Sequence, residues 1–162
     1  MSLNIKKKKM IVAKISKINQ CALSAVIIDF SGICTNDLNK LRKKSRENDV
    51  IINIIRNKLL KLIIKNSNFQ CLEPLINGPI LIAYSLKHPG AAARLIKKFN
   101  KINEKFKIKA ASYNNKIINS ENISILAELP TYEEAIVRFL IIIKDISIGK
   151  LIRTLISIKN IK

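Results

Sequence analysis

The sequence predicts an α/β fold (an α+β sandwich): a small mixed sheet flanked by helices, followed by an extended C-terminal helical spine. Two observations favour it. Short apolar, β-branched runs alternate with segments of helical periodicity, which is typical of strands and helices packed in layers. After Pro130 an apolar stripe at helical spacing continues with no later strand or helix to cover it. The 162 residues suffice for one domain with a sizeable core and an appendage.

The first half of the chain predicts three helices and two strands. The first helix is basic and amphipathic, with Met10, Ile11, Ile15 and Ile18 expected on one side. The first strand is an apolar run that ends at a Ser-Gly turn, and Thr35 can cap the second helix. In chain order these are helix 6–19, strand 23–30, helix 35–48, strand 50–55 and helix 56–64.

The second half predicts two strands, two helices and the tail. Gly78-Pro79 introduces strand 80–85, and Pro89-Gly90 opens an alanine-rich helix over 91–102. An alternating run over 106–113 predicts a fourth strand, and 119–128 a short helix. The glycines fit turns or close-packing positions, since none belongs to a phosphate-binding glycine motif.

The junction at Leu129-Pro130 is the one expected boundary, giving domains 1–129 and 130–162. Thr131 and Glu134 have the spacing of a capping box, so a helix is expected to start there. The apolar stripe after them comprises Ile136, Phe139, Leu140, Ile143, Ile148, Leu151, Ile152, Leu155, Ile156 and Ile158. Cations interleave with it and Asp145 is the single anion among them, which indicates an acidic partner.

The chain is strongly basic, with 30 Lys and Arg against 11 Asp and Glu and a formal charge of +19. Such an excess favours phosphate backbones or anionic membranes as partners. An AT-biased genome could also account for many lysines, so arginines carry more weight. The few aromatic residues favour backbone and shape recognition of folded RNA. The candidate RNA contacts are Arg42, Arg46, Arg56, Asn57, Lys58 and Lys61.

The residue inventory argues against an enzyme or a metal protein. His88 is the single histidine and precedes a proline, so hydrolase triads and two-histidine metal sites lack material. Cys21, Cys34 and Cys71 lack metal-binding spacing and indicate a reducing compartment. No catalytic residue, metal or cofactor is expected. No signal peptide or membrane-spanning run is visible, so a soluble cytoplasmic protein is expected.

Five separated blocks resemble a known family along essentially the whole chain. They include Gly78-Pro79-Ile80-Leu81-Ile82-Ala83-Tyr84-Ser85, His88-Pro89-Gly90-Ala91-Ala92-Ala93-Arg94-Leu95 and Leu129-Pro130-Thr131-Tyr132-Glu133-Glu134-Ala135-Ile136. The others are Gly149-Lys150-Leu151-Ile152-Arg153-Thr154-Leu155 and Arg56-Asn57-Lys58-Leu59-Leu60. Together they resemble the bacterial large-subunit ribosomal protein at the base of the stalk, the "L-ten" family.

The resemblance implies a non-enzymatic scaffold of the large ribosomal subunit. Its N-terminal α/β domain would bind large-subunit rRNA beside a stalk-base protein of the "L-eleven" type. Its C-terminal helix would anchor acidic stalk-protein dimers, about two in a tail of this length, which serve GTP-bound translation factors. The implied dimer-binding residues are Ile148, Leu151, Ile152, Leu155 and Ile156.

Two alternatives remain from the residues alone. A basic amphipathic tail could lie on anionic lipid, making this a peripheral membrane protein. The tail could instead fold back and complete the domain's own core. Vesicle binding without RNA affinity would indicate the first, and a compact monomer in small-angle scattering the second.

Overall fold

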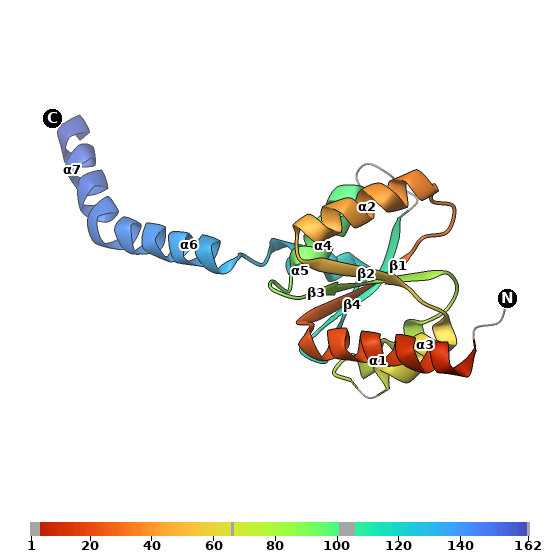
Figure 1. Cartoon of the computed structure of the whole chain (residues 1–162). Coiled ribbons are helices and arrows are strands. Elements are labelled where there is room, and N and C mark those ends of the chain that lie inside the picture. The colour runs from red at the N-terminus through yellow and green to blue at the C-terminus, as the bar shows by residue number, and fades with distance from the viewer. Residues whose placement is uncertain (1–3, 66, 101–105, 162) are drawn as a thin grey trace. The chain divides into compact units, whose positions relative to one another are not determined.

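The computed structural model describes residues 4–65, 67–100 and 106–161, and it separates into two compact units, Met1–Leu129 and Pro130–Lys162 (Figure 1). The first unit contains a sheet and the helices that cover it. Its first elements are α1 (Ile5–Cys21), β1 (Ser24–Asp29), α2 (Thr35–Glu47), β2 (Val50–Ile54) and α3 (Asn57–Ile64). A 3₁₀ segment η1 (Gln70–Leu75) and β3 (Ile80–Ser85) follow, and then α4 (Ala91–Asn100), β4 (Lys107–Tyr113), β5 (Lys116–Asn119), η2 (Ser120–Asn122) and α5 (Ile123–Glu128).

The five strands form one sheet in the order β2-β3-β1-β4-β5. Every pairing is antiparallel, and β1 lies at the centre with its first five residues buried. The α/β fold with flanking helices is therefore confirmed, but the expected mixed sheet is wrong. Strands β1 and β2 run in the same direction, as do β3 and β4, but neither pair is adjacent. Strand β3 lies between β1 and β2, and β1 lies between β3 and β4, so each hydrogen-bonded pair is antiparallel.

Helices cover both faces of the sheet (Figure 1). On one face, α2, α4 and α5 bury an apolar cluster that contains Leu41, Ile96, Phe99 and Leu126 with the sheet residues Val26 and Leu81. On the other, α1, α3 and η1 bury a second cluster with Ile15, Leu60, Ile64, Leu72, Ile27 and Tyr84. Alternation along the strands supplies both clusters, as the period of two requires of a sheet buried on both sides.

Several local expectations differ from the structure. Met10 is 70% exposed, because one residue before Ile11 lies about 100° away around a helix. Thr35 is the first residue of α2, and Cys34 occupies the cap position without a side-chain hydrogen bond. Strand β5, which was not expected, pairs with β4, and the turn that joins them consists of Asn114 and Asn115, both with positive φ.

The second unit is helical from Tyr132 to Ile161. It comprises α6 (Tyr132–Lys144), a π-helical turn η3 (Asp145–Gly149) and α7 (Lys150–Ile161). The capping box is confirmed: the Thr131 N–H donates to Glu134 Oε2 at 3.0 Å, and the Glu134 N–H donates to Thr131 Oγ1 at 3.3 Å. These two bonds set the first residue of α6.

None of the helices, as far as their residues are described, is long and apolar enough to cross a membrane. All three cysteines are free thiols, with Cys21 and Cys34 exposed.

Candidate functional sites

Arg42 and Arg46 extend from the exposed side of α2 towards the edge of the sheet. Both side chains are exposed, and with Ser45 they border a hollow of about 360 Å³ whose other walls are Val50, Ile51 and Ile52 of β2. The Arg42 Nη1 donates to Asn39 Oδ1 at 3.3 Å, one turn earlier in the helix. No ion pair involves either arginine within the described part of the chain. Two guanidinium groups are therefore available for an anionic partner.

Arg56, Asn57 and Lys58 lie at the start of α3. Arg56 occupies the cap position, and its carbonyl accepts from the Leu59 and Leu60 N–H groups at 2.9 and 3.0 Å. The Arg56 and Lys58 side chains are exposed, whereas Asn57 and Lys61 are half-buried. The Asn57 Nδ2 donates to the Gly78 carbonyl oxygen at 2.8 Å. Asn57 thus ties α3 to the turn before β3 and keeps one further N–H for a ligand.

The structure divides the six candidate RNA contacts between opposite faces of the sheet. Arg42 and Arg46 lie over the face covered by α2, whereas Arg56 to Lys61 lie with α3 over the other (Figure 1). Strand β2 runs between the two groups at the edge of the sheet, with β3 as its one hydrogen-bonded neighbour among the described strands. A stretch that is continuous in sequence therefore forms two cationic patches on either side of one edge strand.

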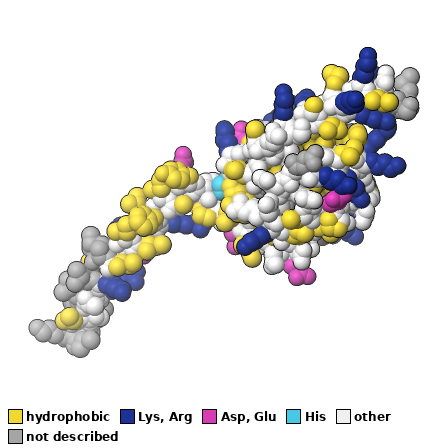
Figure 2. All heavy atoms as spheres, turned by 90° about the horizontal axis from the view of Figure 1, so that it is seen from below, with side chains coloured by type: hydrophobic (Ala, Val, Ile, Leu, Met, Phe, Trp, Pro, Cys, Tyr) yellow, Lys and Arg dark blue, Asp and Glu magenta, His cyan; other side chains and the backbone are white. Residues whose placement is uncertain are grey.

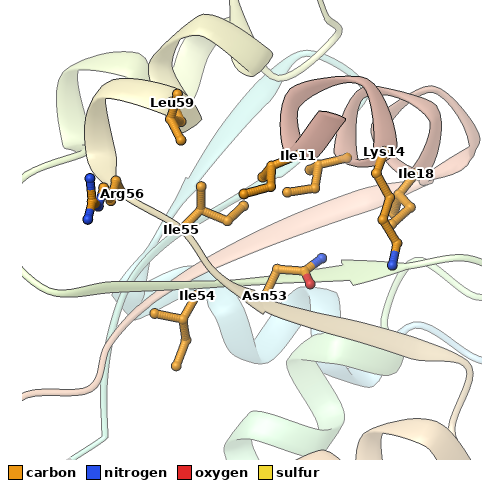
Figure 3. A pocket seen from close by; sticks show the side chains of 9 residues that line it. Ile11, Lys14, Ile18, Asn53, Ile54, Ile55, Arg56 and Leu59 are labelled. Carbon is orange, nitrogen blue, oxygen red and sulfur yellow. The ribbon is translucent and has the colours of Figure 1, made fainter. Parts of the chain in front are cut away.

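A groove between α1 and the β2–α3 segment adjoins Arg56. Its volume is about 450 Å³, and its lining is Ile11, Lys14, Ile15, Ile18, Asn53, Ile54, Ile55, Arg56 and Leu59. Figure 3 shows the α1 side chains facing Asn53 and Ile55, while Ile54 points to the other side of the strand. A second hollow lined by Lys8, Arg56, Asn57, Lys58 and Leu59 shares two residues with it.

The sequence-based candidates omit Asn53, Lys8 and Lys14. The signal for Asn53 is a lone amide inside the apolar run of 50–55. For the lysines the signal is weaker, because a basic helix face usually contacts only solvent. Only the fold shows which of the α1 lysines adjoin Arg56.

The second unit exposes a large amount of apolar surface. On α6 the exposed side chains are Tyr132, Ile136, Val137, Phe139, Leu140, Ile141, Ile142 and Ile143. They extend beyond the expected stripe to Val137, Ile141 and Ile142. Figure 2 shows hydrophobic side chains along this unit, with Lys and Arg beside them. Monomeric proteins rarely leave such a continuous apolar surface uncovered, which indicates a binding surface.

The expected partner-binding residues of α7 are described in part. Ile152 and Ile156 are 50% and 52% exposed, one helical turn apart. Ile148, Leu151 and Leu155 belong to η3 and α7 by their backbone, but their side chains lie outside the described residues. Arg153 Nη2 lies 4.0 Å from Asp145 Oδ1, an exposed ion pair across the π-helical turn.

His88 and Tyr84, two side chains of types that occur in catalytic sites, pack or hydrogen-bond within the first unit. His88 Nδ1 accepts from the Gly90 N–H at 3.1 Å and closes the turn before α4. No group of three His, Cys, Asp or Glu residues in the described ranges could hold a metal ion. Burial raises the pKa of the Tyr84 hydroxyl, which packs against Phe69 in the core. His88 and Tyr84 therefore contribute to the fold.

Comparison with known proteins shows a match over the whole chain. The sequence profile of a family described as Ribosomal protein L10 matches residues 3–101. Two similar relatives, from Klebsiella pneumoniae and Salmonella arizonae, each carry the description "Large ribosomal subunit protein uL10". Each is 46% identical over 162 residues, covering 100% of this chain and 98% of the relative.

Proposed function

We propose, since this chain belongs to the ribosomal protein L10 family, that it joins large-subunit rRNA to acidic stalk proteins. Membership makes it a structural, large-subunit ribosomal protein of the cytoplasm, in a family that is not enzymatic. The finer role has two parts: the Met1–Leu129 unit binds rRNA, and the Pro130–Lys162 unit anchors two acidic dimers. The observation that carries the proposal is the contrast between a cationic first unit and an exposed apolar second one.

The rRNA part of the proposal rests on the two patches beside β2. Arg42, Arg46, Arg56 and Lys58 are exposed, and neither patch's hollow has an acidic residue in its lining. Arginine fits a phosphate through two parallel N–H donors, and the N-terminus of α3, next to Arg56, also favours an anion. Two patches on either side of one edge could contact two RNA segments at once.

Replacing Arg56 by Ala tests this part. The full chain is titrated with large-subunit rRNA at several salt concentrations, and the log–log slope is expected to fall by about one for each phosphate that the variant no longer neutralises. Lys116→Ala, an exposed cation on the opposite edge strand β5, is the matched control and should leave the slope unchanged. An unchanged slope and affinity for Arg56→Ala would contradict the assignment.

The anchoring part rests on the exposed apolar residues of the second unit. The proposed seats are Ile148, Leu151, Ile152, Leu155 and Ile156, of which Ile152 and Ile156 are described and exposed. Lys150, Arg153 and Lys159 lie in the same helix and favour an acidic partner. Apolar contacts would supply most of the affinity, and the cations would provide specificity for an acidic partner.

Replacing Ile152 and Ile156 together by Ser tests the seats. Each buried isoleucine contributes roughly 1.5–3 kcal/mol, so the pair should weaken dimer capture by orders of magnitude. Native mass spectrometry of the chain co-expressed with its acidic partner measures both capture and stoichiometry. Ser157→Ala in the same helix is the control, and rRNA affinity should not change. Full capture by the double variant would contradict the seats.

Further partners follow from the same proposal. A stalk-base protein of the "L-eleven" type would bind the same rRNA beside the first unit, and GTP-bound translation factors would meet the dimers and not this chain. The alternative, a peripheral membrane protein, is favoured by the basic amphipathic helices. Flotation with anionic vesicles distinguishes the two, because the membrane alternative requires vesicle binding that depends on the tail.

A further inference from the structure

We propose that the groove between α1 and β2 receives one unstacked nucleobase of the bound RNA, whose edge pairs with the side-chain amide of Asn53. This rests on the proposed rRNA binding and assigns it a specific recognition site. The groove has apolar walls from α1 and from the segment that runs from β2 into α3, chiefly Ile11, Ile15, Ile18 and Leu59. Its volume of about 450 Å³ is sufficient for a base and its sugar.

Asn53 is the uncharged polar residue in the lining of the groove. Its Nδ2 is buried and has no hydrogen-bond partner among the described residues. A buried donor without a partner is rare in a folded protein, and a specific one calls for an explanation. An acceptor on a base edge would provide the missing bond, since Asn pairs well with adenine and can donate to other acceptors.

Asn53 belongs to a wider group of unpartnered atoms beneath α1. The other buried side-chain atoms without partners in the described chain belong to Asn19, Tyr84 and Ser112. Tyr84 and Ser112 both pair in register with Ala25, so they lie on the same sheet face, which α1 and α3 cover. Asn53 is the member of this group that lines the groove, so a ligand in the groove would lie nearest to its amide.

The positive charge around the groove favours a ligand that carries phosphate groups. Lys14 lines the groove, Arg56 belongs to both this groove and the adjoining hollow, and Lys8 and Lys58 line that hollow. Neither lining contains Asp or Glu. Phosphates on either side of the inserted base would meet these cations, while aliphatic walls enclose the base as apolar pockets do in proteins that extract a nucleotide.

Access to Asn53 requires a side-chain movement. The Nδ2 lies beneath the surface of the empty groove. Lys14 is exposed and ends on the groove beside Asn53 (Figure 3), and its long side chain can turn aside without a backbone change. When RNA binds, the Lys14 ammonium group contacts an RNA phosphate instead of water.

The test compares Asn53→Leu with the wild-type full chain. Leu matches the size of Asn and removes a donor that has no partner in the free protein, so the fold should be retained. Affinity for large-subunit rRNA is expected to fall by about 5- to 150-fold, the discrimination one base contact provides, with an unchanged salt slope. The Arg56→Ala variant should show the opposite signature, a reduced slope.

Chemical probing identifies the base itself. With wild-type protein, one nucleotide should become reactive at its 2′-hydroxyl, as an unstacked residue does, while its base edge is protected from dimethyl sulfate. Asn53→Leu should lose that protection, and Asn36→Leu, an exposed change on α2, should keep it.

The outcomes separate the two proposals. Wild-type affinity and an unchanged footprint for Asn53→Leu would overturn the base site, although RNA binding would stand. A chain that does not bind rRNA at all would overturn the proposed function. Loss of binding to the neighbouring stalk-base protein, with normal rRNA affinity, would show that the groove binds a peptide and would also overturn the base site.

Discussion

Arg94 of α4 holds the backbone of Leu129, where the first unit ends: its Nη2 donates to the Leu129 carbonyl oxygen at 2.5 Å. Its Nε donates to the Ala127 carbonyl oxygen at 2.8 Å. The last carbonyls of a helix have no partner within the helix, so Arg94 completes the end of α5. One guanidinium thereby fixes the position from which the chain continues into Pro130.

Replacing Arg94 by Met should therefore destabilise the first unit. The variant lacks two hydrogen bonds from a charged donor to partly buried carbonyls, and a decrease of about 2 kcal/mol in the free energy of unfolding is expected. Urea denaturation of the full chain measures it. Arg138→Met, an exposed arginine on α6, is the matched control. Equal decreases for both variants would show that the Arg94 hydrogen bonds contribute nothing specific.

Gly90 should not tolerate a side chain. A Cβ at this position would lie 2.5 Å from the Leu126 carbonyl oxygen, so α4 and α5 would have to separate. Gly90→Ala is expected to lower stability by about 1–3 kcal/mol, the usual range for overpacking. Thermal unfolding checks this against Ala91→Ser, a small change at the next residue. A melting temperature equal to that of the wild type would contradict the close contact.

The carboxyl of Asp29 should make stability pH-dependent. The Ser31 hydroxyl, then the Ser31 N–H and the charge of Lys109, lower the pKa of Asp29, while burial opposes them. A lowered folded pKa means that the stabilisation is present above the unfolded value of 3.8 and is lost as the pH falls through the folded value. Asp29→Asn should cost about 1 kcal/mol at pH 7 and nothing in strong acid.

Carboxyl carbon NMR titration measures the pKa of Asp29 directly. Ser31→Ala removes the largest cause of the shift, so the pKa should move back towards 3.8. Denaturation curves for Asp29→Asn that run parallel to the wild type at every pH would contradict the linkage.

The π-helical turn η3 should absorb a one-residue deletion. Ile143 and Ile148 are five residues apart, which in an α-helix would rotate the stripe by about 140°. A turn closed over five residues has a smaller rotation per residue, so a five-residue step comes closer to one full turn. Deleting Ser147 shortens the step to four residues, about 40° in an α-helix, so dimer stoichiometry should be retained.

Deleting Thr154 should have a different effect, because this residue lies in the α-helix α7 and not in the π-helical turn. Ile156 would rotate by about 100° relative to Ile152, and the seat on α7 should be lost. Native mass spectrometry of both deletions with the acidic partner compares them. Equal stoichiometry in both would show that the angular position of the stripe does not matter.

Much of the fold could be predicted from local signals. Strand β3 matches the predicted range of 80–85, because Gly78-Pro79 marks its start, and the capping box set the start of α6. The antiparallel order could not be predicted, since strand pairing depends on contacts far apart in sequence. Strand β5 was not predicted, because it is short and only the Asn114-Asn115 pair, a hairpin signal, marks its start.

The candidate site was predictable in residue type but not in arrangement. Exposed arginines on α2 and before α3 follow from charge and periodicity. Their separation by the sheet depends on which face each helix covers, and that choice is made by the whole core. The role of Asn53 could not be predicted either. A polar residue in an apolar strand becomes a candidate ligand-binding residue only when the structure shows that α1 forms a groove with that strand.

The outer side of β2, which no described strand pairs with, has a consequence for handling the purified protein. An edge strand with free backbone groups can pair with the edge strand of a second molecule. Charges of one sign near the edge commonly prevent this pairing. Here Arg42, Arg46 and Arg56 would repel an identical molecule. Since that repulsion extends only about 3 Å in 1 M salt, concentrated electrolyte should promote self-association, which sedimentation velocity would detect.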